Sequence, residues 1–168
     1  MSTKRLIIEQ ATGLAALLLF VAISIYLAPL KPNIVELQLA FGPAAFQRVI
    51  ELWQAEGVRL FRSHFVADFA LLACYGVNGY LFASRTSLFQ RYSQAAKNSV
   101  VFSMPFAAVC DAIENCLHLY FTAPGTSAAS VLYPVSATCS TLKFVLILIY
   151  LGNILWAAIC QRKVTAND

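Results

Sequence analysis

Titratable side chains stand inside two apolar stretches of this 168-residue sequence. His64 and Asp68 are four residues apart, so on a helix they lie one above the other on the same face. At about 100° per residue, a second set occupies one arc of another helix and comprises Asp111, Glu114, Asn115 and His118. Carboxylates and imidazoles can bind cations, exchange protons or ligate metals. Two helices are therefore predicted to present one polar face each.

A charged side chain at the centre of a membrane helix costs about 2.5–3.5 kcal/mol, which indicates that these groups have a function. Carboxylates that lie close together must be paired, protonated or bound to a cation. Tyr75 continues the polar face inward from Asp68. We expect one site that holds a cation, a proton or a polar lipid headgroup, formed by Asp68, Tyr75, Asp111, Glu114 and Asn115.

Two further interpretations remain open. His64, Asp68, Glu114 and His118 could ligate a divalent metal such as zinc, manganese or iron, which take imidazole and carboxylate ligands. The protein would then be an enzyme acting on a lipid-like substrate, with a histidine as acid/base or ligand. Haem between the two histidines is disfavoured because carboxylates flank both. Alternatively, the cluster is structural and holds helices, a partner subunit or a second copy of the chain together.

The composition defines the elements that must position these residues. The chain is 60% hydrophobic and 12% charged, with a mean hydropathy of +0.70, whereas soluble domains carry about 25% charged residues. A helix of about 20 apolar residues crosses a bilayer, and backbone groups in lipid must bond within the helix. The sequence predicts one all-α domain, residues 1–168, which is a transmembrane four-helix bundle with spans at about 6–30, 64–84, 99–123 and 144–161.

The longest segment between the predicted spans is 31–63. Residues 35–41 alternate apolar and polar side chains, which indicates an extended piece. An amphipathic helix is predicted at about 43–56, ended by Gly57, and its apolar stripe consists of Phe46, Val49, Ile50 and Trp53. This segment should lie along the membrane surface as an extracytoplasmic cap.

Basic residues predict the orientation. The side of the termini has seven of them, namely Lys4, Arg5, Arg85, Arg91, Lys97, Arg162 and Lys163. The other side has five, among which Lys143 precedes the predicted last span, and the connection 124–142 carries no charge. Both termini are therefore predicted to be cytoplasmic. Since the basic residues lie between apolar runs, the expected partners are the bilayer and other membrane proteins or copies of the chain, and nucleic acid is excluded.

Several short motifs follow one another between about Val35 and His118. They are Glu36-Leu37, Trp53, Asp68-Phe69, Tyr75-Gly76 and the D-x-x-E-N step Asp111-x-x-Glu114-Asn115. This order resembles a group of small four-helix bacterial integral membrane proteins of uncharacterised function. The resemblance implies the bundle, the intramembrane acidic site and a location in the bacterial inner membrane, but no activity. The histidines are not part of the pattern, which weakens the metal interpretation.

Overall fold

The computed structural model describes residues 3–90 and 92–165, and this part of the chain is helical without β-strands. Its long helices are α1 (Thr3–Leu27), α3 (Pro43–Ser63), α4 (Phe65–Arg85), α5 (Gln94–Phe121) and α6 (Leu132–Thr165), and its short ones are α2 (Ile34–Gln38) and η1 (Ser87–Phe89). Four segments are long and apolar enough to cross a membrane, namely Leu6–Leu27, Phe65–Arg85, Gln94–Phe121 and Leu132–Gln161. The all-α prediction is confirmed, and the four segments indicate a multi-pass membrane protein.

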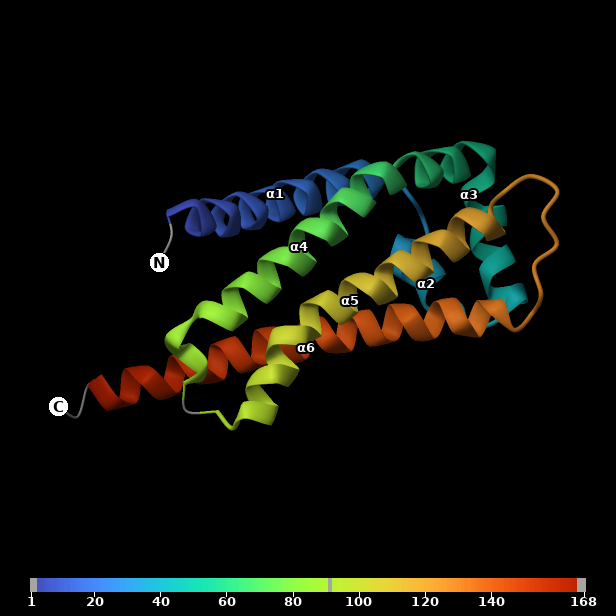
Figure 1. Ribbon diagram of the computed structural model, residues 1–168. Helices are drawn as coiled ribbons and strands as arrows, with labels where there is room; N and C mark the ends of the chain where they lie inside the picture. The colour runs from blue at the N-terminus through green and yellow to red at the C-terminus, as the bar shows by residue number, and fades with distance from the viewer. Residues whose placement is uncertain (1–2, 91, 166–168) are drawn as a thin grey trace.

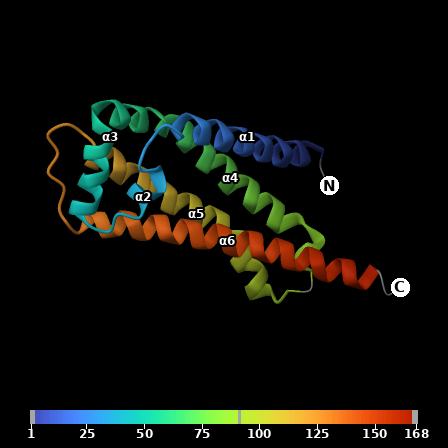
Figure 2. The same ribbon diagram turned by 180° about the vertical axis from the view of Figure 1, so that it is seen from behind.

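The four apolar helices lie in a row in the order α1, α4, α5, α6 (Figure 1). α1 packs on α4, α4 on α5 and α5 on α6, but within the described residues no extensive packing joins α1 to α6. The row therefore has an open side between its first and last helices. Seen from behind, α2 lies on this side and contacts α6 (Figure 2). α2 and α3 occupy one end of the bundle, opposite the start of α1 and the end of α6 (Figure 1).

α1 is attached to the bundle mainly through α4. Gly13 lets the helices approach closely, because a Cβ added there would lie 2.9 Å from Asn78 Nδ2. Asn78 Nδ2 also donates to the main-chain oxygen of Glu9 at 2.7 Å. The Glu9 carboxylate, the one charge of the first predicted span, lies 3.5 Å from Arg85 Nη1.

α2 and α3 form a cap that buries the predicted apolar stripe. Phe46 and Trp53 are almost fully buried. Phe46 packs edge-on against Phe121 of α5 and Tyr133 of α6, with ring centroids 5.3 Å apart in both pairs. Trp53 Nε1 donates to Pro32 O at 2.6 Å. The apolar stripe of α3 therefore packs on the end of the bundle.

Two local predictions in this cap were wrong. The first helical segment of α3 is interrupted at Gln54, where φ is 55°, and not at Gly57, and a second helical segment that contains Gly57 continues to Ser63. Gly57 instead leaves room for the Trp53 side chain, because a Cβ at position 57 would lie 2.8 Å from Trp53 Cβ. The segment predicted to be extended forms α2, since the Asn33 side chain caps its start by accepting from the main-chain N of residues 35 and 36.

The last span also differs from the prediction. α6 begins at Leu132, so much of the supposed connection 124–142 is helix. The prediction begins the last span just after Lys143, because a lysine is typical of a membrane boundary, whereas Lys143 is buried inside α6. Without it, the basic residues number seven against four, and the orientation stays a prediction. Arg91, one of the seven, lies outside the described residues.

Candidate functional site

Lys143 joins the acidic residues of α5 to α6. It lies about 16 Å along α6 from Leu132, at 1.5 Å per residue, so its charge is deep in the span. Its Nζ lies 2.8 Å from Asp111 Oδ1 and 2.7 Å from Glu114 Oε2. The first contact is a hydrogen bond, and the second is an ion pair whose angles fall outside hydrogen-bond geometry. All three side chains are buried, so Lys143 offsets part of the carboxylate charge.

Two residues of α4 complete the cluster. Tyr75 OH donates to Asp111 Oδ2 at 3.0 Å, so this carboxylate receives hydrogen bonds from α4 and α6. Asn115 Nδ2 donates to Asp68 Oδ2 at 2.6 Å. The structure thus brings together the α4 and α5 faces that the sequence singled out. Their contacts involve Asp68, Tyr75, Asp111 and Asn115, whereas Glu114 pairs with Lys143 of α6.

The histidines lie beside this cluster without completing a metal site. His118 Nδ1 is 3.8 Å from Glu114 Oε1, too far for a hydrogen bond, and its ring packs near Phe61. His64 Nδ1 bonds to the main-chain oxygen of Phe61. In the described ranges, no three His, Cys, Asp or Glu side chains gather in a way that could hold a metal ion. Metal ligation by His64, Asp68, Glu114 and His118 stays a prediction that this geometry does not favour.

A cavity of about 710 Å³ opens between α1 and α6 beside the cluster. Its apolar wall includes Ala16, Leu17 and Phe20 of α1 and Phe144 and Ile147 of α6, and α2 closes part of its edge. Its polar lining includes His64, Asp68, Tyr75, Asp111 and Lys143. Small-molecule sites have volumes of about 300–1,000 Å³ and combine apolar walls with a few placed polar groups. The cavity therefore has the size and chemistry of a ligand site.

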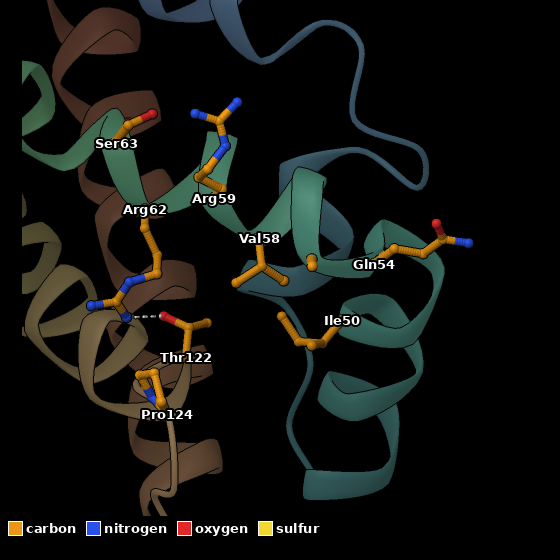
Figure 3. Close-up of a pocket in the computed structure, with 9 residues that line it drawn as sticks. Ile50, Gln54, Val58, Arg59, Arg62, Ser63, Thr122 and Pro124 are labelled. Atoms are coloured by element: carbon orange, nitrogen blue, oxygen red, sulfur yellow. Dashed lines mark hydrogen bonds between the residues drawn. The ribbon is translucent and has the colours of Figure 1, made fainter.

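A second hollow of about 700 Å³ lies between the last turns of α3 and the end of α5 (Figure 3). Arg62 points toward Thr122, donating to its Oγ1 at 2.7 Å and to Leu119 O at 2.8 Å. Arg59 pairs with Glu56 at 2.7 Å, and this hydrogen bond lowers the pKa of Glu56. An exposed pair of this kind contributes little to stability. The polar groups of this second hollow therefore pair with one another, and Arg62 attaches the cap to α5. The polar cluster in the first cavity is the better candidate site.

Lys143 was missed by sequence reasoning, although a signal for it exists. Ser136, Ser140 and Lys143 recur at i, i+4 and i+7, the spacing of one helix face. All three are buried in the structure. The prediction places Ser136 and Ser140 in a connection between spans, so the pattern lies outside the predicted helix.

No family model, curated protein or solved structure matches the sequence. The resemblance to small bacterial four-helix membrane proteins therefore stays a prediction. The functional conclusion has to come from the cavity and its polar lining.

Proposed function

We propose that the protein is a membrane-embedded binding protein for an amphipathic, lipid-like molecule. The polar head of this ligand binds at Asp68, Tyr75, Asp111 and Lys143, and its apolar tail lies between α1 and α6. The observation that carries the proposal is the cavity of about 710 Å³ on the open side of the helix row, where apolar walls meet this polar cluster.

The polar cluster supplies the selectivity of such a site. Lipid tails are about as apolar as the leucines of a helix, so packing a tail against α1 and α6 discriminates weakly between lipids. Hydrogen bonds to charged groups are roughly twice as strong as neutral ones and depend on direction. The headgroup therefore determines which lipid binds.

The open side of the row provides a route of entry from the bilayer. α1 packs mainly on α4, so a lipid can reach the cavity between α1 and α6 without crossing the protein. With the termini in the cytoplasm, α2 and α3 lie at the extracytoplasmic surface. The ligand then comes from the outer leaflet of the bacterial inner membrane.

A pair of matched substitutions in α1 tests the proposal. Ala16 lines the cavity, whereas Ala22 is exposed and is not part of its lining. Ala16→Phe should fill the tail space and reduce the lipid retained by detergent-purified protein, measured by mass spectrometry of extracted lipid. Ala22→Phe adds the same side chain to the lipid-facing surface and should retain as much lipid as the wild type. Equal retention by both variants would contradict the proposal and favour a purely structural cluster.

A further inference from the structure

Asp68 lines the cavity, and one of its carboxylate oxygens has no hydrogen-bond donor among the described residues. Its Oδ2 accepts from Asn115 Nδ2 at 2.6 Å. Across residues 3–90 and 92–165, no group donates a hydrogen bond to its other oxygen, Oδ1. The Asp68 side chain lines the cavity, so a ligand placed there can supply the missing donor.

His64 supplies a second acceptor one helical turn away. The two residues share a face, because Asp68 N donates to His64 O at 3.0 Å. His64 is 4% exposed, and its Nδ1 bonds to Phe61 O. A carbonyl oxygen only accepts, so Nδ1 carries the proton and a neutral ring has a lone pair at Nε2. Within the described chain Nε2 has no hydrogen-bond partner, although the side chain lines the cavity.

The surroundings of Asp68 also favour a cation. Lys31 and Lys143 both line the cavity, but among the described residues neither forms an ion pair with Asp68. Lys143 contacts Asp111 and Glu114, and Asp68 is held by the uncharged Asn115. Asp68 is half-buried, and a carboxylate withdrawn from water without a compensating charge is costly, so a positive group beside Asp68 is stabilising.

We infer that the site selects a primary ammonium group on the amphipathic ligand, with Asp68 Oδ1 and His64 Nε2 accepting its N–H bonds. This inference rests on the proposed function and names its substrate class. A primary ammonium carries one positive charge and three N–H donors, of which two can bond to the two acceptors while the charge compensates that of Asp68. The group can come from an aminophospholipid or from a single-chain alkylamine.

Defined lipids isolate the role of the N–H donors. The full-length protein, delipidated in detergent, is titrated with phosphatidylethanolamine and phosphatidylcholine, and binding is followed by native mass spectrometry. Both headgroups carry a phosphate and a positive nitrogen, but only phosphatidylethanolamine has N–H donors. Loss of hydrogen bonds to a charged group should weaken phosphatidylcholine binding by about tenfold or more. Hexadecylamine, which lacks the phosphate, shows whether the amine suffices.

Variants assign the preference to the two acceptors. Asp68→Asn keeps a side-chain oxygen that can accept from Asn115 but removes the negative charge. His64→Phe keeps an aromatic ring but removes the acceptor nitrogen Nε2. Each should bring phosphatidylethanolamine binding down toward that of phosphatidylcholine. Glu51→Gln is the matched control, since Glu51 is exposed on α3 away from the cavity, and it should leave the preference unchanged.

The outcomes separate this inference from the proposed function. Equal binding of the two phospholipids by the wild type, or stronger binding of the anionic phosphatidylglycerol, would overturn the ammonium inference and leave lipid binding in place. An unchanged preference in Asp68→Asn would also overturn it. Absence of binding by every probe would contradict the proposed function itself. Because the wild-type comparison involves no substitution, a misfolded variant cannot decide the result.

Discussion

Replacing Lys143 by Met removes the lysine that pairs with Asp111 and Glu114 within the described part of the chain. Lys143 is 5% exposed, so its replacement leaves two buried carboxylates without their cationic partner. Removing one member of a buried ion pair costs about 3–5 kcal/mol. For a chain of this size, about 2–4 °C of Tm per kcal/mol corresponds to a decrease of about 6–20 °C. Thermal unfolding in detergent, followed by circular dichroism, measures this change.

Two comparisons make this expectation specific to the buried charges. Lys97→Met is the same substitution at a half-buried position near the start of α5, and we expect it to shift the Tm far less. The triple variant Lys143→Met/Asp111→Asn/Glu114→Gln removes all three charges, so no uncompensated charge is left buried. It should therefore recover most of the lost stability. The reasoning is refuted if Lys143→Met and Lys97→Met have equal Tm values, or if the triple variant is the least stable.

Three further substitutions test the packing and the site. Gly79→Ala places a Cβ 2.4 Å from Met104 Cβ and should lower the free energy of unfolding by about 1–3 kcal/mol. Gly152→Ala is the control, because a Cβ there has nothing within 4 Å, and it should leave the free energy of unfolding unchanged. Similar unfolding curves for the two variants would contradict the close approach of α4 and α5. Trp53→Phe loses the hydrogen bond to Pro32 O and should cost about 1 kcal/mol in the same assay, while Trp156→Phe, at a position that is 64% exposed, should be neutral. Tyr75→Phe removes the donor to Asp111 Oδ2 and should weaken headgroup binding several-fold in lipid titrations, with little loss of secondary structure. An unchanged affinity would show that Tyr75 does not bind the headgroup.

The number of spans, the approximate bounds of the first three and the two polar faces could be predicted because they depend on local sequence. Lipid offers the backbone no hydrogen bonds, so long apolar runs have to be helical. Within a helix, the spacing of Asp111, Glu114 and Asn115 fixes their common face whatever the neighbours are. The contact of Asn115 with Asp68 then follows from the packing of consecutive helices, which the structure confirms.

Lys143 and the cavity could not be obtained in this way, because they depend on tertiary structure. A lysine at the end of an apolar run is typical of a membrane boundary, and only its pairing with Asp111 and Glu114 makes it an interior residue. Likewise, no local pattern predicts that α1 packs on α4 without closing against α6. The open side of the row, and with it the cavity, follows from that arrangement.

The most direct test of the ligand site is to photolabel the protein in vesicles with a phosphatidylethanolamine that carries a diazirine in its tail. Peptide mass spectrometry then locates the labelled residues. We expect labelling concentrated on cavity-lining positions such as Ala16, Phe20 and Phe144, and its reduction by excess unlabelled phosphatidylethanolamine. Equal labelling of lipid-facing positions such as Leu148 and Trp156, without competition, would show that lipid only surrounds the protein and would contradict the ligand site.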